Sequence, residues 1–289
     1  MKIAICYSGA VRGLLNNLNH VVDVLFPDRK EHEIDFYLYA DYNGGTIHQK
    51  DIENGKVEPQ GAKVQKERAD FNCCLVNELD GFSNRMAKFQ NKIKNYHMPY
   101  KEQVHQWYSV QKVFDFVFEQ EKEYDVYVRI RCDLFPAGIM KFDWSNFEKN
   151  KVYVPFNAPF GGINDRFAFG SKKAMRIYSN FYDSDIYYSV EELNDKLINK
   201  GKAFYNKYYS HVPTDTYRGG DNNSEFRLMS YLHNNDLEID VLPGDELHIG
   251  SVRDSFNVIR YPGPDLEEKL LKYNGFTVDE LKYDRVWWR

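Results

Sequence analysis

The sequence lacks several features that would assign it to a particular class of protein. No C-x-x-C pair occurs among its four cysteines, so we do not expect a zinc site. These cysteines are best explained as the reduced thiols of a cytosolic protein. No apolar run approaches the length of a membrane span, and the apolar stretch at residues 3–7 is too short for the core of a signal peptide.

The chain also lacks a block of basic residues. Its formal net charge is -5, with both signs interleaved, so we expect no nucleic-acid partner. Aromatic residues are abundant by contrast, with 22 Tyr and 20 Phe. Rings with a polar tip suit sugars and nucleobases, although the same residues also fill cores.

The pattern along the chain alternates between strand-like and helix-like segments. Strands are expected at residues 3–7, 35–40, 71–79, 124–133, 151–156, 165–170 and 237–242, and helices at 14–26, 100–121, 172–182 and 224–234. Residues 46–65 have no period and predict a loop. This alternation indicates an α/β fold with a mostly parallel sheet flanked by helices in a single domain, residues 1–260. The tail, 261–289, has no clear strand and predicts a short helical extension.

The strand that ends in Arg131-Cys132-Asp133 is the most informative segment. Alternation places Arg129 and Arg131 on one face of it, and Asp133 follows at its end. Charges at the end of a buried strand are costly unless they hold a charged partner. In open α/β sheets this edge forms the ligand crevice. Asp133 therefore predicts a divalent-metal or phosphate site, and the equal alternative is an Arg–Asp ion pair that only fixes the loop.

Four further segments carry candidate residues. Ser8 and Gly9 open a glycine-containing loop, and Arg12 lies at a helix start that would favour a phosphate. Asp165 follows two glycines and either binds hydroxyl groups, takes a proton or belongs to a turn. Glu225, or Asp221 before it, is a candidate general base beside a possible N-cap, Ser224. His248 is a candidate second ligand for a metal at Asp133.

In this order the segments resemble glycosyltransferases of the GT-A fold. The chain segments that carry the likeness are Ile5–Arg12, Gln106–Lys112, Tyr124–Leu134, Asn164–Gly170 and Ser224–Leu228. Tyr124–Leu134 is similar to the strand that bears the D-x-D metal motif, and Arg131 replaces its first Asp. The chain looks more like the soluble enzymes of bacteria and large DNA viruses, such as those that build chlorovirus glycans, than like Golgi-resident relatives. A cytoplasmic location, that of the host for a viral protein, follows from this resemblance.

The resemblance implies transfer of a sugar from a UDP- or GDP-sugar to a hydroxyl of a glycan acceptor. The donor would lie near Ser8, Gly9, Arg12 and Asp41, with Arg131 and Asp133 at its diphosphate. Mn²⁺ or Mg²⁺ would join Asp133, with His248 as a further ligand, to the phosphates. For an inverting enzyme Glu225 is favoured over Asp165 as the base. For a retaining enzyme neither needs to act as a base, and Asp165 would position sugar hydroxyls.

Two other classes remain open at the level of sequence. A carbohydrate- or nucleotide-binding module without catalysis is compatible with the tyrosines and with the altered D-x-D motif. A nucleotidyltransferase would share the sheet and the acidic strand end. Its first loop normally contains lysine and several glycines, which Ser8–Gly13 does not.

Overall fold

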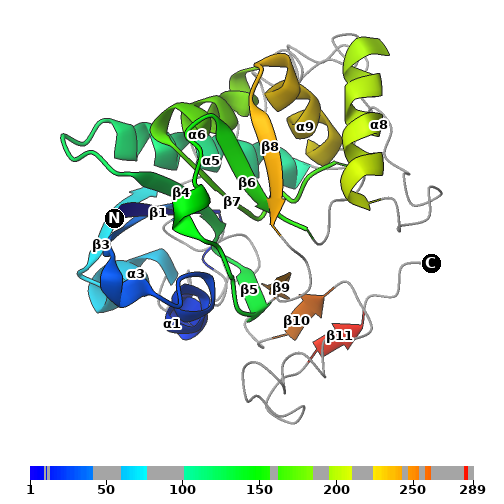
Figure 1. Ribbon diagram of the computed structural model, residues 1–289. Coiled ribbons are helices and arrows are strands. Elements are labelled where there is room, and N and C mark those ends of the chain that lie inside the picture. Colours follow the sequence, from blue (N-terminus) through cyan, green and yellow to red (C-terminus); the bar gives the residue numbers. More distant parts are fainter. Residues whose placement is uncertain are drawn as a thin grey trace.

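A computed structural model describes the protein at residues 1–9, 11, 14–41, 60–76, 101–156, 162–184, 195–209, 224–242, 247–253, 258–261 and 283–285. The described segments form a seven-stranded sheet covered by helices and a second, four-stranded sheet beside it (Figure 1). No described helix is both long enough and apolar enough to cross a bilayer.

The large sheet has the strand order β3-β2-β1-β4-β7-β6-β8. Its strands are β1 (Lys2–Ser8), β2 (Glu33–Asp41), β3 (Phe71–Val76), β4 (Val126–Arg131), β6 (Lys151–Pro155), β7 (Phe167–Gly170) and β8 (Glu238–Leu242). β3, β2, β1 and β4 run parallel, and β8 runs parallel to β6. β7 is antiparallel to both of its neighbours. The predicted α/β fold with a mostly parallel sheet is therefore confirmed.

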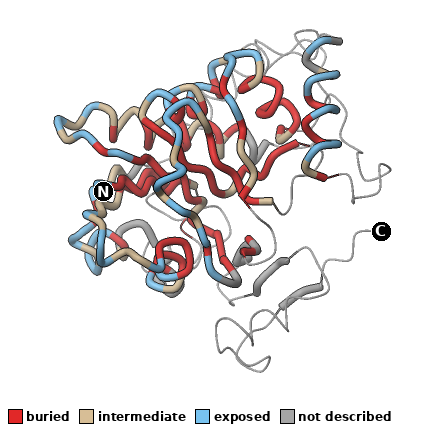
Figure 2. Tube along the Cα trace, in the orientation of Figure 1, coloured by how far each residue is buried: buried red, intermediate tan, exposed pale blue. Residues whose placement is uncertain are grey.

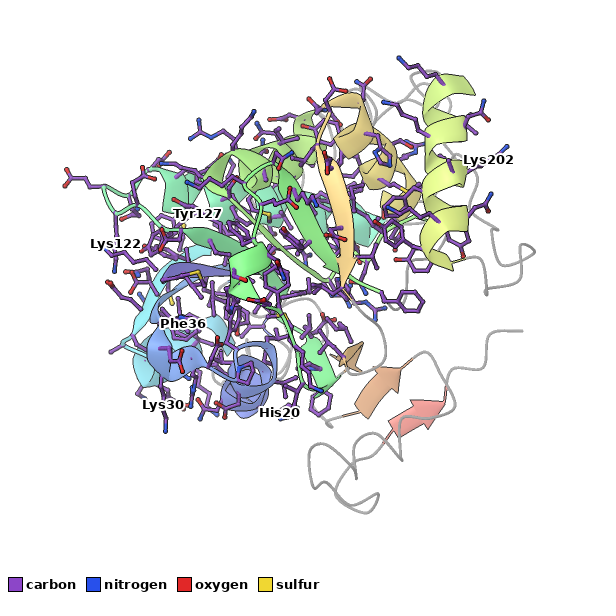
Figure 3. All side chains as sticks on the ribbon, in the orientation of Figure 1. His20, Lys30, Phe36, Lys122, Tyr127 and Lys202 are labelled. Atoms are coloured by element: carbon purple, nitrogen blue, oxygen red, sulfur yellow. The ribbon has the colours of Figure 1, made fainter. Side chains whose placement is uncertain are left out.

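Helices cover both faces of this sheet. On one face lie α1 (Leu14–Leu25) and α3 (Gln60–Glu67), and on the other lie α5 (Lys101–Phe118), α6 (Lys172–Ser179), α8 (Asp195–Tyr209) and α9 (Ser224–Asn234). β4 follows the predicted alternation, because Val126, Val128 and Ile130 pack on the α1 side and Tyr127 packs on the α5 side. Buried residues run through the strands and the inward sides of the helices (Figure 2). Lys202 lies on the exposed side of α8 (Figure 3).

The smaller sheet was not predicted. It has the order β11-β10-β9-β5, with β5 (Leu134–Gly138), β9 (Leu247–Arg253), β10 (Val258–Tyr261) and β11 (Tyr283–Arg285). β5 follows β4 after a two-residue turn, and it pairs antiparallel with a strand more than a hundred residues later. Such pairing leaves no local periodicity in the sequence. The strand β11 lies in the tail in which no strand was expected. The helical extension expected there falls outside the described residues.

Two further predictions differ from the structure in their bounds. α3 begins at Gln60, inside the predicted loop of residues 46–65, and Val64 is its fully buried apolar residue. A polar helix with so few apolar residues shows no 3.6-residue period. The helix expected at 172–182 ends as α6 at Ser179 and continues as a 3-10 helix, η4 (Asn180–Asp183). Ser171 caps α6, since its hydroxyl accepts a hydrogen bond from Ala174 N at 3.2 Å. Two more 3-10 helices are η1 (Arg29–Glu31) and η3 (Trp144–Asn146).

Many of the aromatic residues belong to the core. Trp107 of α5 is fully buried, with its ring centroid 4.8 Å from that of Phe181 and 5.6 Å from that of Tyr178. Tyr182, Tyr205 and Tyr209 are buried as well. Tyr178 and these three tyrosines therefore serve in packing, which is the second of the two roles that the sequence left open for the aromatic residues.

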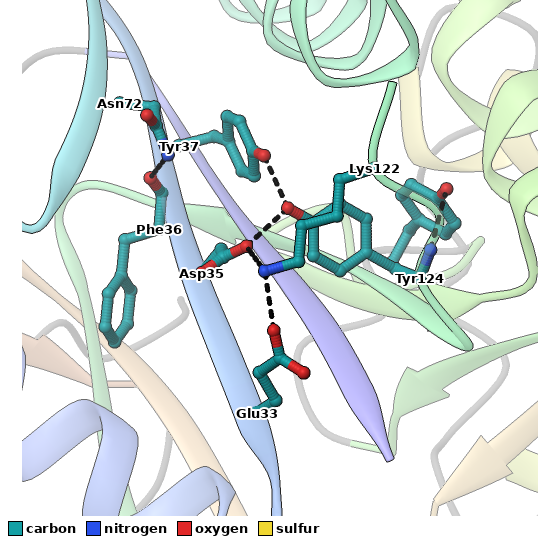
Figure 4. A network of polar contacts seen from close by, with 8 residues as sticks. Glu33, Asp35, Phe36, Tyr37, Asn72, Lys122 and Tyr124 are labelled. Atoms are coloured by element: carbon teal, nitrogen blue, oxygen red, sulfur yellow. Dashed lines mark hydrogen bonds and ion pairs between the residues drawn. The ribbon is translucent and has the colours of Figure 1, made fainter. Parts of the chain in front are cut away.

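A polar network joins β2 to the loop before β4, and it lies at the N-terminal ends of the parallel strands. Tyr124 donates to Asp35 at 2.5 Å, and Lys122 contacts Asp35 and Glu33 at 2.5 and 2.7 Å (Figure 4). Burial raises the pKa of the Asp35 carboxyl, but the hydrogen bonds from Lys122 and Tyr124 outweigh this and leave the pKa below its usual value. The network lies at the edge opposite the predicted crevice and is best explained as structural.

Candidate functional site

Arg131 and Asp133 form an ion pair at the C-terminal end of β4. The Arg131 guanidinium donates from Nε to one carboxylate oxygen of Asp133 and from Nη2 to the other at 3.2 Å. The Asp133 side chain is 9% exposed. Burial lowers the pKa of Arg131, but Asp133 and Asp165 outweigh this and the pKa is raised. The ion pair that the sequence left as an alternative is present, so the pair holds the turn between β4 and β5 whatever else it does.

This pair lies at the point where the strand order reverses. Ser8 pairs with Arg131 across β1 and β4, and Cys132 N donates to Ser8 O at 3.2 Å. β1 continues through α1 to β2 on one side, while β4 lies on its other side. In open α/β sheets this reversal, at the C-terminal ends of the strands, is where ligands bind. Ser8 and Asp133 therefore lie at the edge that the sequence predicted.

Gly9 follows β1 at the same edge. Its φ of +104° is a conformation that other residues rarely adopt, and a Cβ built there would meet no atom within 4 Å. The glycine is therefore required by backbone conformation and leaves open space beside the strand end. Arg12 lies outside the described residues. Asp41 ends β2 at the same edge, and its backbone alone is described.

Asp165 lies in the segment between β6 and β7. Its side chain accepts a hydrogen bond from the Gln106 amide of α5, and the residue is 6% exposed. The preceding residue forms the expected turn, since Arg166 N donates to Asn164 Oδ1 at 2.8 Å. Arg166 O in turn accepts from Arg131 N at 3.0 Å and from Arg129 Nη1 at 2.5 Å. The turn and the end of β4 therefore hold Asp165 near Arg129 and Arg131.

Glu225 lies in the first turn of α9. Ser224 belongs to the helix and donates its hydroxyl to Glu225 Oε2 at 2.9 Å, rather than acting as the cap expected before the helix. Gly162 lies directly against the helix start. A Cβ at this glycine would overlap Glu225 C, Glu225 O and Phe226 N, and Ile163 N donates to Glu225 O at 3.4 Å. The glycine that precedes the Asp165 turn therefore places Glu225 beside that turn.

The two carboxylates, Asp165 and Glu225, interact electrostatically. Burial first and the charge of Asp165 second raise the pKa of Glu225 to about 8, against the opposing hydrogen bond from Ser224 and charge of Arg166. At neutral pH Glu225 is therefore mostly protonated. A carboxyl with a pKa near the working pH is suited to proton transfer.

We expect Glu225→Gln to change how the free energy of unfolding depends on pH. A folded pKa of about 8 lies above the unfolded value, so the folded state retains a proton that the unfolded chain loses. Stability should fall as pH rises from about 5 to 8, by up to about 1.4 kcal/mol per unit. The glutamine variant should lose this slope and exceed the wild type in melting temperature at pH 8.5. Parallel slopes for both proteins in urea titrations would contradict the raised pKa.

The described residues do not form a metal site by themselves. No group of three or more His, Cys, Asp or Glu side chains gathers among them in a way that could hold an ion. Both oxygens of Asp133 are engaged by Arg131. His248 lies in β9, opposite Ala137 of β5, and its side chain is outside the described part of the chain. Its predicted role as a ligand therefore stays a prediction.

Three residues that lie at the candidate site, around Arg131, Asp165 and Glu225, were not among the site residues predicted from the sequence. Arg129 is fully buried, Gln106 holds Asp165, and Gly162 contacts the start of α9. The alternation along β4 already placed Arg129 on the face of Arg131. Nothing local indicates the contact of Gly162, because its partner Glu225 lies more than sixty residues later in the chain. Asp221, the alternative base, lies outside the described residues.

No family model matches the sequence of this chain, and no curated protein matches it. Its fold is similar to mouse xyloside xylosyltransferase 1, with 9% identity, a TM-score of 0.36 and coverage of 84% of this chain and 85% of the other. The galactosyltransferase LgtC with donor and acceptor sugar analogues gives 11% identity, a TM-score of 0.33 and 86% coverage of both chains. A mannosyltransferase from Pyrobaculum calidifontis, in complex with GDP-Man and Mn²⁺, gives 8% identity and a TM-score of 0.31. The match covers 60% of this chain and 45% of the other.

Proposed function

We propose that this protein is a glycosyltransferase that moves a sugar from a nucleotide diphosphate donor to a hydroxyl group of a glycan. The observation that supports it most is the placement of the Arg131–Asp133 pair at the reversal of strand order, within the same charged cluster as Asp165 and Glu225. These residues come from the segments whose motifs resemble GT-A enzymes. A purely structural ion pair would not require two more carboxyl groups beside it.

The donor would lie along the C-terminal ends of β1, β2 and β4. Gly9 leaves open space there, so the backbone after β1 can approach a ligand closely. Arg12 comes after β1 in the chain, and Asp41 is the last residue of β2. Both are proposed to contact the nucleotide. Arg131 is proposed to balance charge on the diphosphate as the leaving group departs, which is how fixed cations accelerate such a step.

Glu225 is proposed as the base for an inverting reaction. Only its ionised form, which is the minor form at neutral pH and predominates above about pH 8, can act in this way. That form would accept the proton of the acceptor hydroxyl as oxygen attacks the anomeric carbon and the bond to the diphosphate breaks. A pKa of about 8 gives it a stronger affinity for that proton than an exposed carboxylate has. Asp165, held by Gln106, is better placed to accept hydrogen bonds from sugar hydroxyls. In a retaining reaction Asp165 would still bind sugar hydroxyls, and Glu225 would not need to act as a base.

Assistance by Mn²⁺ or Mg²⁺ remains a proposal from the resemblance. The donor set described here is one carboxylate already bonded to Arg131, which is not a complete set for an oxygen-loving ion. No step above depends on a metal. Arg131 is instead proposed to neutralise the charge that develops on the leaving diphosphate.

A thermal-shift panel of UDP- and GDP-sugars, each with and without Mn²⁺, tests the donor proposal. We expect one donor to raise the melting temperature by several degrees, because a ligand that binds only the folded state stabilises it. The same donor should be hydrolysed slowly without an acceptor, which a binding module would not do. No shift with any nucleotide sugar, with or without the ion, would contradict the proposal. A shift without hydrolysis would favour a binding module.

A further inference from the structure

A groove of about 590 Å³ lies at one end of the large sheet. It is formed by α8, by the last residues of α9 and by β8, which is the final strand in the order of that sheet. These three elements follow one another there, since α8 packs on α9 and α9 packs on β8 (Figure 1). Pockets for small ligands commonly measure about 300–1,000 Å³. The groove therefore has the size of a ligand site.

The groove is separate from the candidate site. Lys151, the first residue of β6, and Glu238, the first residue of β8, both line it. β4, β6 and β8 run in the same direction, because β7 is antiparallel to β4 and to β6, and β8 is parallel to β6. The candidate site is at the C-terminal end of β4. The groove therefore lies at the opposite edge of the sheet, and no step of the proposed reaction uses it.

Charges of both signs line the groove in equal number. Among the described residues around it, the charged side chains are three lysines and three carboxylates, Lys151, Lys200, Lys207, Asp236, Glu238 and Asp240. Lys151 Nζ lies 3.9 Å from a carboxylate oxygen of Glu238 and 3.8 Å from one of Asp240. An anion would be repelled by the carboxylates and a cation by the lysines. The groove therefore favours an uncharged ligand that offers both hydrogen-bond donors and acceptors.

Aromatic side chains form the remaining wall. Phe204 is buried, with its ring centroid 4.8 Å from that of Tyr208 and 5.6 Å from that of His233. Burial and the charge of Lys200 lower the pKa of His233, so this ring adds no charge at pH 7. Tyr208 is half-buried, and its hydroxyl accepts a hydrogen bond from Lys207 Nζ at 3.0 Å. Tyr208 thus brings an apolar ring with a polar tip to the charged part of the groove.

We propose that this groove is a second carbohydrate-binding site, which holds an uncharged oligosaccharide apart from the site of transfer. A sugar hydroxyl both donates and accepts hydrogen bonds, so one sugar ring can bond to a lysine and a carboxylate together. Its C–H groups can pack on the aromatic wall. As a site for the acceptor glycan this rests on the proposed function, but the binding itself does not.

Protection of the sheet edge is the competing explanation for part of this arrangement. Charged residues on an edge strand deter pairing with another chain, and Glu238 and Asp240 of β8 fit that role. It gives no reason for Lys207 and Tyr208, which come from α8 and face the same groove. A protected edge and a sugar site therefore differ in whether a ligand contacts the α8 side.

NMR of protein labelled with ¹³C in the tyrosine rings tests the proposal. The Tyr208 signal would be assigned by its loss in Tyr208→Phe. We expect at least one uncharged trisaccharide among maltotriose, cellotriose, xylotriose and triacetylchitotriose to shift this signal at millimolar concentration. The cationic glucosamine trimer and the anionic trigalacturonic acid should shift it less. No shift with any uncharged trisaccharide, or a larger shift with a charged one, overturns the proposal.

Two lysine variants on the same helix test the location. Lys207→Ala should weaken binding of the trisaccharide about tenfold, because a hydrogen bond to a charged group is lost. Lys202→Ala is the matched control, since Lys202 lies on the exposed side of α8 and does not line the groove (Figure 3). It should bind within about twofold of wild type. Equal affinities in the two variants would contradict the proposal.

The two proposed sites can fail independently. Thermal shift with a nucleotide sugar reports on the donor, whereas the Tyr208 signal reports on the groove at the other edge of the sheet. A donor that stabilises the protein while no trisaccharide shifts Tyr208 contradicts the second site alone. A Tyr208 shift without stabilisation by any nucleotide sugar supports the second site and contradicts the transferase.

Discussion

Asp133→Asn is expected to lower the rate of sugar transfer by about 10²–10³-fold while the protein remains folded. The loss is of the size seen when one fixed electrostatic group is removed from an active site. Asparagine keeps the shape of the side chain and one acceptor for Arg131, but it removes the charge that orients this guanidinium at the end of β4. The measurement is turnover of the donor identified by thermal shift, beside circular dichroism of both proteins.

Asp125→Asn is a suitable control for that variant. Asp125 immediately precedes β4, at the opposite end of the strand, where its exposed carboxylate accepts from Lys2 N at 2.8 Å. The same change of charge there should leave turnover within about twofold, because an exposed contact of this kind contributes little. Full activity in Asp133→Asn would remove the assignment of this carboxylate to the reaction. An equal loss in both variants would show that the effect is not local.

Gly162→Ala is expected to destabilise the protein by about 3 kcal/mol or more. The added methyl group would overlap backbone atoms of Glu225 and Phe226, which cannot turn aside as a side chain can. The overlap can be relieved only if α9 moves away from the turn that bears Asp165. Urea denaturation would measure the loss, and the pKa of Glu225 should fall toward its ordinary value as the two carboxyl groups separate.

Gly201→Ala is the matched control for this prediction. Gly201 lies in α8, and a Cβ there would meet Met229 Cε and Phe226 Cε2 at 2.8 Å. These are the ends of side chains that can shift, and alanine favours a helix over glycine by about 1 kcal/mol. The net effect should therefore stay within about 1 kcal/mol. A loss for Gly162→Ala no larger than that for Gly201→Ala would show that α9 is not held by this contact.

The parallel half of the large sheet was predictable because its signals are local. The apolar runs of β1, β2 and β4 mark strands, and the helical spacing of the buried residues in α5 marks the helix that precedes β4. The small sheet was not predictable, because β5 pairs with β9 and their register is set by tertiary contact. α3 was missed for a different reason: its segment is mostly polar, and among the side chains that the structure describes in it Val64 is the one that is fully buried.

The sequence by itself determined the α/β class, the two faces of β4 and the candidate carboxylates Asp133, Asp165 and Glu225. These follow from the period of apolar residues and from charges placed where strands and helices end. Tertiary structure alone decided that Arg129 is enclosed with its guanidinium on the Arg166 carbonyl, and that Gly162 brings Glu225 beside the turn of Asp165. The reason is physical. Burial and the proximity of residues far apart in the chain set the charges and pKa values of these groups, and no local sequence pattern shows which distant residues will meet.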